Sequence, residues 1–233
     1  MCSFERPPLP NGTTAPDALT SNWQCPFHVA RRALTVDRHQ YVFHQGDAAT
    51  GAYCLTSGLV ALQRVNEKGD MVIFRLLRPG AFFSCCDLFG GFHRNSAQAI
   101  TPATMCRIDR QELLAHANHN LAGADRLLDV AFRETRDSED EMFRLHTLDL
   151  PERVVFLLTQ LADRPMRRDA DTVTFSIPVR RKDLAAMAGT SPEVLSRTIR
   201  RLENSGVAKF DGQRVTLWRS RLECDTAAQL LSA

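Results

Sequence analysis

Between residues 34 and 108, short runs of β-branched and aromatic residues alternate with turns that contain Gly, as in YVFHQGD and VALQRV. The runs recur roughly every ten residues, and no helical pattern separates them. The segment EKGD at 67–70 predicts a hairpin turn, because Gly accepts the positive φ that such turns need. This pattern predicts an antiparallel β-barrel or jelly roll rather than a parallel sheet.

Residues 110–147 have helical spacing instead. One heptad register places a single stripe along this helix, made of Leu121, Ala124, Leu128, Ala131, Thr135, Ser138, Met142 and Leu145. A stripe of this length predicts the seam of a two-helix dimer. The alternative is a helix that lies on the barrel with its apolar face buried. Thr135 and Ser138 make the middle of the stripe polar, so they need partners from a second subunit or from a molecule bound beside the helix.

A boundary follows at the sequence DLPE, residues 149–152. Pro151 suits the first turn of a new helix, with Asp149 or Leu150 as its cap. The sequence ERVVFLLTQLA continues that helix, residues 164–172 predict a polar loop, and VTFSIPV predicts a strand.

Residues 182–204 predict a helix-turn-helix. Gly189 stands where the tight turn needs positive φ, Ser191 caps the second helix, and Pro192 occupies its first turn. The residues that we expect this helix to bury are Val194, Leu195, Ile199 and Leu202. Gly206 ends the helix, and a hairpin that turns at 211–212 completes a winged helix-turn-helix.

The second helix leaves a polar face outward. Glu193, Ser196 and Arg197 are spaced i, i+3, i+4 near its N-terminus, the part of a recognition helix that enters the major groove. Arg can bond guanine in bidentate fashion, Glu can accept from cytosine N4, and Ser can take either role. Arg200 and Arg201 lie a turn further along and suit phosphates. This arrangement predicts sequence-specific DNA binding.

Composition places the chain among ordinary globular proteins, with 44% hydrophobic and 24% charged residues in 233. Residues 151–233 hold 14 Lys and Arg against 10 Asp and Glu, whereas the rest of the chain is slightly acidic. This split suggests two modules, the second facing an anion. No apolar run is long enough to cross a bilayer, and residues 1–22 form a polar arm without the features of a signal peptide, so we expect a cytoplasmic protein.

A β-roll, a long helix and a winged helix-turn-helix, in that order, resemble the Crp/Fnr family of bacterial transcription regulators. The resemblance covers about residues 30–220 and includes FHQGDAATGAYCLTSGLVAL at 43–62 and RPGAFF at 78–83. The sequence EVLSR at 193–197 is similar to the Glu-x-x-Ser-Arg reading face of the Fnr branch. That likeness implies a homodimer on an inverted repeat with half-sites resembling TTGAT, and RNA polymerase as a partner.

The resemblance also locates an effector pocket. The cyclic-AMP branch of the family carries a Gly-Glu pair and an Arg-Ser pair, and the matching positions here are Ser84-Cys85 and Asn95-Ser96. Without that Glu and that Arg we do not expect cyclic AMP, because a charge-assisted phosphate bond is lost. The candidate effector residues are Ser84, Cys85, Cys86, Arg94, Asn95, Ser96, Thr135 and Ser138.

The family's iron-sulfur and haem sensors give two further options. Cys25 resembles the last of the clustered iron-sulfur ligands and Cys106 the distal one, although the close upstream pair of cysteines is missing. Haem would use Cys85 or Cys86 with His93 as axial ligands. A thiol switch at Cys85-Cys86 is the remaining option and needs a partner such as Cys54, since bonding between neighbouring cysteines is strained. Seven cysteines without an export signal do not predict a disulfide framework.

We therefore predict an α+β protein with a mobile arm (1–22), a β-roll sensor (23–109), a dimerisation helix (110–148) and a winged helix-turn-helix domain (149–233). Its predicted function is sensing a signal and regulating transcription, without catalysis. Two alternatives stay open at this point: a cupin-like metal enzyme that uses His39, His44 and His93, and a cyclic-nucleotide-binding module that regulates a partner without binding DNA.

Overall fold

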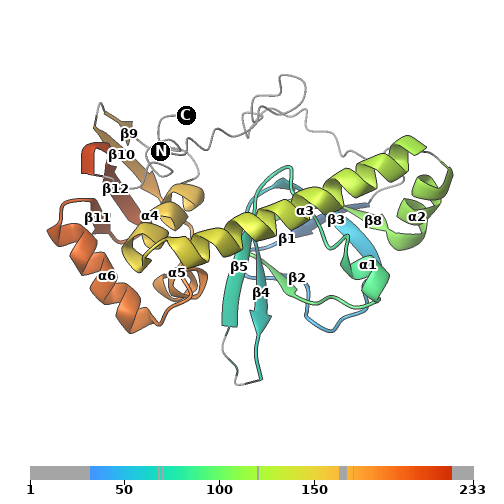
Figure 1. Ribbon diagram of the computed structural model, residues 1–233, viewed down its shortest axis with the longest axis horizontal. Helices are drawn as coiled ribbons and strands as arrows, with labels where there is room; N and C mark the ends of the chain where they lie inside the picture. Colours follow the sequence, from blue (N-terminus) through green and yellow to red (C-terminus); the bar gives the residue numbers. More distant parts are fainter. Residues whose placement is uncertain are drawn as a thin grey trace.

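A computed structural model describes residues 32–67, 69, 71–119, 121–162, 167–169 and 171–221. The predicted arm at 1–22 and the candidate ligand Cys25 lie outside these residues. The structure consists of a β-roll and a winged helix-turn-helix domain, with a long helix that runs from one to the other (Figure 1). The predicted fold class is confirmed.

The β-roll is built from two four-stranded sheets, ordered β1-β8-β3-β6 and β2-β7-β4-β5. The strands are β1 (Arg32–Val36), β2 (Tyr41–Phe43), β3 (Gly51–Ser57), β4 (Val60–Val65), β5 (Met71–Leu77), β6 (Phe82–Phe83), β7 (Ser96–Ala99) and β8 (Ala103–Asp109), with helix α1 (Asp87–Gly90) between β6 and β7. All neighbours in the two sheets pair antiparallel. Large apolar side chains such as Phe83, Leu55 and Met105 fill a buried cluster contributed by both sheets.

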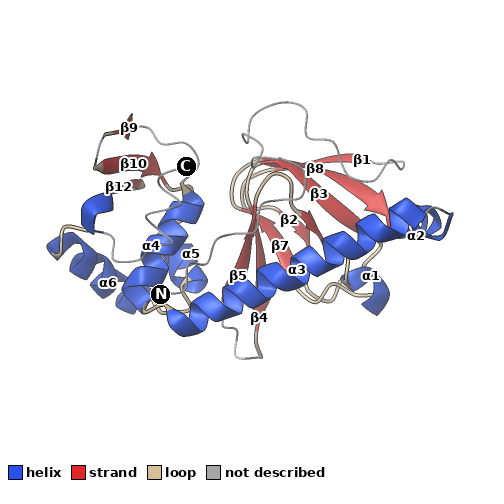
Figure 2. Ribbon diagram, turned by 45° about the horizontal axis from the view of Figure 1, so that its top comes forward, coloured by secondary structure: helices blue, strands red, loops and turns tan. Residues whose placement is uncertain are grey.

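The single helix predicted at 110–147 is wrong, because two helices occupy this stretch: α2 (Arg110–His119) and α3 (Leu121–Thr147). Helix α2 packs against α3 at the end of the molecule away from the winged helix-turn-helix domain (Figure 1). Gly123 permits this approach, because a Cβ there would lie 2.6 Å from Cδ2 of His116. Helix α3 then runs along the β-roll, as Figure 2 shows.

Most of the predicted stripe on α3 is exposed in the single chain, and its last members, Ser138, Met142 and Leu145, line a cleft beside β5. Leu121, Leu128, Met142 and Leu145 are exposed, and Phe132 and Phe143 are exposed beside them. The face of α3 that packs on the β-roll includes Leu127 and Val130, which contact a buried cluster beneath the helix. The alternative, in which the stripe itself is buried on the barrel, is therefore wrong.

The second domain combines helices α4 (Leu150–Leu161), α5 (Arg181–Met187) and α6 (Pro192–Asn204) with the sheet β11-β12-β10-β9. Its strands are β9 (Arg167–Arg168), β10 (Thr172–Ser176), β11 (Ala208–Asp211) and β12 (Arg214–Trp218), and the 3₁₀-helix η1 (Arg219–Arg221) follows. The loop predicted at 164–172 is wrong in part, since β9 lies within it. Asp149 caps α4 in a capping box with Glu152, as the boundary predicted.

The turn between β3 and β4 lies close to the start of β8, the strand that pairs with β3. Gly58 has φ +83°, and a Cβ on it would lie 2.8 Å from Cα of Ala103. Gly69 has a similar φ of +84°, but a Cβ on it would meet nothing within 4 Å. We expect Gly69→Ala to lower the free energy of unfolding by about 1–2 kcal/mol, the cost of a left-handed non-glycine residue. Gly58→Ala should cost about 3 kcal/mol or more, because a backbone clash adds to that strain.

Thermal and urea unfolding of the two variants, followed by circular dichroism, measures this difference. Equal losses for the two alanine variants would contradict the close approach at Gly58.

Candidate functional site

Helix α6 is the best-defined candidate site. Ser191 is its N-cap and its hydroxyl accepts a hydrogen bond from the Val194 backbone N–H at 3.3 Å, while Pro192 occupies the first turn. Gly189, in the preceding turn, has φ +65°. The buried side of the helix consists of Leu195, Thr198, Ile199 and Leu202, and Val194 is half-buried. The predicted helix-turn-helix is therefore present in the structure.

The opposite side of α6 is charged and open to solvent. Glu193, Arg197, Arg200 and Arg201 are exposed. The side-chain bond to Ser191, a backbone hydrogen bond and the nearby Arg197 charge hold the pKa of the Glu193 carboxyl below its usual value. Glu193 therefore stays ionised at neutral pH, ready to accept hydrogen bonds. Three guanidinium groups and one carboxylate on one surface suit a phosphate-rich ligand with base edges within reach.

Ser196 differs from its predicted outward position. Its side chain is half-buried, and its hydroxyl donates to the carbonyl oxygen of Pro192 at 2.8 Å. Because the only hydroxyl proton is used inside the helix, Ser196 can offer lone pairs to a ligand and no donor.

The sequence analysis missed basic residues beside α6. Lys209 and Arg214 are exposed on the hairpin formed by β11 and β12, and Arg181 and Lys182 are exposed in the first turn of α5. The sequence did carry a signal for Lys209 and Arg214, because these two basic residues stand on either side of the hairpin turn predicted at 211–212.

The predicted effector residues do not converge on one cavity. Ser84 has φ +67°, and its hydroxyl lies 2.8 Å from Nδ1 of His93, which in turn lies 3.2 Å from a carboxylate oxygen of Asp87. All three side chains are buried, and the His93 ring stacks on Phe43 with 3.6 Å between ring centroids. These groups hold the segment between β6 and β7 together and do not line the cavities beside α3.

The other predicted effector residues also have internal partners. Asn95 accepts from the Arg64 guanidinium at 2.8 Å and 3.1 Å, and the Ser96 hydroxyl accepts from the Gln45 backbone N–H at 2.9 Å. Arg94 is exposed. Thr135 and Ser138 donate to carbonyl oxygens of their own helix, those of Ala131 and Glu134. The predicted need for a partner on these two hydroxyls is therefore met within α3.

The cysteines at 85 and 86 have different surroundings. Cys85 is buried and Cys86 is exposed. Burial and the neighbouring Glu134 carboxylate raise the pKa of Cys85 to about 12. Cys86 loses only part of its solvent contact, and this partial burial together with the same carboxylate raises its pKa to about 11. Cys86 donates to a carboxylate oxygen of Glu134 at 3.4 Å. Both thiols are therefore protonated at neutral pH, which makes them weak nucleophiles.

The structure bears on the predicted metal sites through the described residues, which do not include Cys25. Within the parts of the chain that the structure describes, no group of three or more His, Cys, Asp or Glu side chains is placed to hold a metal ion. Cys85, Cys86, Cys106 and His93 therefore do not form such a site together, and neither do the three histidines of the cupin-like alternative. Cys106 faces Cys54 across the ladder of β3 and β8, and both contribute to the cluster under α3.

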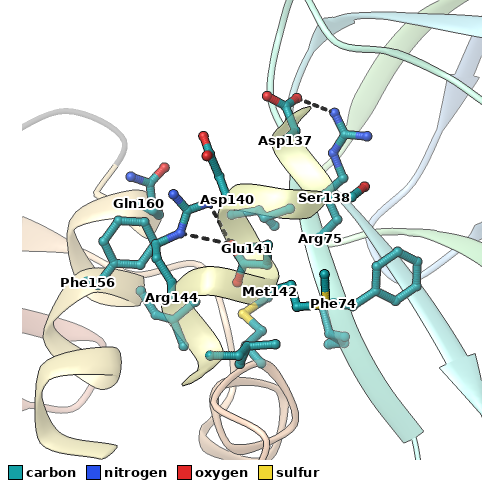
Figure 3. Close-up of a pocket in the computed structure, with 15 residues that line it drawn as sticks. Phe74, Arg75, Asp137, Ser138, Asp140, Glu141, Met142, Arg144, Phe156 and Gln160 are labelled. Carbon is teal, nitrogen blue, oxygen red and sulfur yellow. Dashed lines mark hydrogen bonds and ion pairs between the residues drawn. The ribbon is translucent and has the colours of Figure 1, made fainter. Parts of the chain in front are cut away.

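Two clefts flank the inner side of α3. One, of about 440 Å³, is lined by the Arg75, Arg126 and Arg133 guanidiniums and by acidic side chains of α3. The other, of about 390 Å³, lies between β5, α3, α4 and α5, and Figure 3 shows its residues. Arg75 of β5 reaches both clefts and forms ion pairs with Asp137 and Glu134 of α3. Sequence reasoning missed Arg75, which looks like an ordinary polar residue on a strand.

No helix in the described part of the chain is both long and apolar enough to cross a membrane.

Comparison with known proteins supports the two-domain organisation. The family model for the cyclic nucleotide-binding domain matches residues 33–120, and that for the Crp-like helix-turn-helix domain matches residues 152–223. The Transcriptional activatory protein AadR of Rhodopseudomonas palustris is 29% identical over 176 residues, 75% of this chain and 73% of that protein. The Nitrogen fixation regulation protein FixK of Azorhizobium caulinodans is 28% identical over 185 residues, 79% of this chain and 74% of its own length.

The fold is shared with solved structures. The structure of FixK2 from Bradyrhizobium japonicum aligns with a TM-score of 0.68 at 24% identity and covers 86% of this chain and 97% of that one. At this identity the likeness establishes the order of a β-roll, a connecting helix and a winged helix-turn-helix.

The Cys86 environment leads to a test of the contact between α3 and the β-roll. Replacing the carboxylate in Glu134→Gln removes the negative charge that raises the pKa of Cys86. The pKa should fall, and alkylation of Cys86 by iodoacetamide at pH 8.5 should become faster. Peptide mass spectrometry measures the rate at Cys86, with the same substitution at the exposed Glu139 as a control. An unchanged rate in Glu134→Gln would contradict the contact.

Proposed function

Because the chain belongs to the Crp/Fnr family of transcription regulators, we propose that it acts as a homodimer that binds an inverted repeat of double-stranded DNA through α6. The observation that carries this proposal is the exposed charged face of α6, with Glu193 and Arg197 near the N-terminus of a capped helix. A helix N-terminus that enters the major groove brings these two side chains to base edges.

Each charged residue takes a distinct role in this proposal. Arg197 donates to O6 and N7 of a guanine and Glu193 accepts from a cytosine N4, which suits a half-site resembling TTGAT. Arg200 and Arg201 bind phosphates, and Lys209 and Arg214 of the hairpin add phosphate contacts at the flank. Ser191 caps α6 and thereby supports the position of Glu193. The acceptor-only Ser196 contributes less than the sequence predicted.

The exposed stripe on α3 supports dimerisation through that helix. Leu128 is 55% exposed, Met142 57% and Phe132 60% in the single chain, which is unusual for large apolar residues that are grouped along one helix. Pairing two α3 helices would cover these side chains in a coiled coil. It would also place two α6 helices against successive major grooves, about 34 Å apart.

The protein acts in this proposal in the cytoplasm, together with RNA polymerase. The sensing step takes place at the contact between the β-roll and α3. The support is the cleft of about 440 Å³ in which Arg75 forms ion pairs with α3. A signal that changes these ion pairs would shift α3 relative to β5 and bias one arrangement of the DNA-binding domains.

Substitution of Arg197 tests the base-reading role. Arg197→Ala should weaken binding to a TTGAT inverted repeat by about 1–3 kcal/mol and relax selectivity at one base pair, because a bidentate base contact is lost. Fluorescence anisotropy on the repeat, on its single-base variants and on a random duplex measures both effects.

Arg201→Ala is the matched control in the same helix. It should weaken binding to all these duplexes by a similar factor and reduce the slope of affinity against salt concentration, because it removes a phosphate contact. Equal losses on the specific and the random duplex for Arg197→Ala would refute its assigned role.

A further inference from the structure

Arg153 joins the end of α3 to the turn of the helix-turn-helix. It lies in the first turns of α4, and its Nη2 donates to the carbonyl oxygens of Leu145 at 2.8 Å and Leu148 at 3.1 Å. Its Nη1 donates to the carbonyl oxygen of Ala188 at 3.0 Å. Leu145 belongs to the last turn of α3, and Ala188 is the C-cap of α5. One guanidinium thus binds the C-terminal ends of two other helices.

Arginine is suited to this position for two reasons. The last carbonyls of a helix lack intrahelical partners and carry partial negative charge, so a cation there is favourable. The guanidinium is a planar fork that reaches several acceptors in fixed directions, whereas a lysine ammonium is a point charge. The Nε of Arg153 is buried without a hydrogen-bond partner among the described residues. The side chain therefore keeps its position at the cost of one unmade bond, because the three carbonyl contacts outweigh it.

The Arg153 contact connects α3, the proposed dimer helix, to the helix-turn-helix that carries α6. Helix α5 packs against α6, and α3 carries the exposed stripe. The turn between α5 and α6 passes directly by the guanidinium, since a Cβ on Gly189 would lie 3.8 Å from Nη1 of Arg153. A rotation of the helix-turn-helix relative to α3 would separate the Ala188 carbonyl from the Leu145 carbonyl, and Arg153 binds both.

We propose that Arg153 is a positioning residue that fixes the angle of α6 relative to α3 and so sets the half-site spacing that the dimer accepts. The proposal rests on the proposed function above. One added base pair moves a half-site by about 3.4 Å along the DNA and turns it by about 35°. A rigid connection rejects that change, and a loosened one tolerates it.

The experiment measures spacing preference by fluorescence anisotropy. The duplexes carry the same two TTGAT half-sites at the preferred spacing and with one base pair added or removed, and a further duplex carries one half-site. The wild-type protein should bind the altered spacings at least about tenfold more weakly than the preferred one. Arg153→Ala should reduce this ratio to about threefold or less, while its affinity for the single half-site changes by less than about twofold.

Arg136→Ala is the matched control, since Arg136 is an exposed arginine in the middle of α3, away from the helix end that Arg153 contacts, and it should behave like wild type. Arg153→Lys keeps the charge, but an ammonium cannot contact both helix ends, so this variant should also bind the altered spacings more nearly as well as the preferred one. If circular dichroism shows that Arg153→Ala does not fold, Arg153→Lys provides the test. A wild-type spacing ratio in the folded variants would overturn the proposal, as would an equal loss on the single half-site. Failure of the wild-type protein to prefer TTGAT over random duplex would instead overturn the proposed function.

Discussion

The apolar contact between the β-roll and the DNA-binding domain determines where the reading helix lies. Four residues of the β-roll belong to the same buried cluster as α4, α5, α6 and the wing sheet. They are Leu59 in the turn before β4, Ala61 of β4, Ile73 of β5 and Ile100 in the loop that follows β7. Helix α6 packs into that cluster through Leu195, Ile199 and Leu202. Because protein interiors are close-packed, a displacement of β5 must be accommodated by α5 and α6. The orientation of the charged face therefore depends on this core.

Strand β5 contacts both α3 and the winged helix-turn-helix domain. Ile73 belongs to the core shared with the DNA-binding domain, and Arg75, two residues later, forms ion pairs with Asp137 and Glu134 of α3. Figure 3 shows Arg75 and Asp137 at one side of the cleft, with Phe156 and Arg144 at the other. The side chains of Arg75 and Glu134 are only 19% and 15% exposed, so their attraction is less screened than that of a surface pair. A displacement of Arg75 would therefore alter its ion pairs with α3 and, through Ile73 of the same strand, the packing against α5.

The sequence predicted the parts of this account that depend on local signals. The second helix of the helix-turn-helix could be predicted from Gly189, Ser191 and Pro192, because a tight turn, a helix N-cap and a first helical position each favour particular residue types. The break between α2 and α3 escaped prediction, since it depends on a tertiary contact between Gly123 and His116. Arg153 escaped for the same reason: along the chain it resembles a solvated helix residue, and its carbonyl partners become neighbours only after folding.

The most direct test of the central claim is a hydroxyl-radical footprint of the full chain on DNA that contains an inverted repeat of TTGAT. If two α6 helices read successive major grooves, the footprint shows two equivalent protected patches about one helical turn apart, related by the symmetry of the repeat. A single patch would contradict the dimer, and protection equal to that of a scrambled sequence would contradict specific reading by α6.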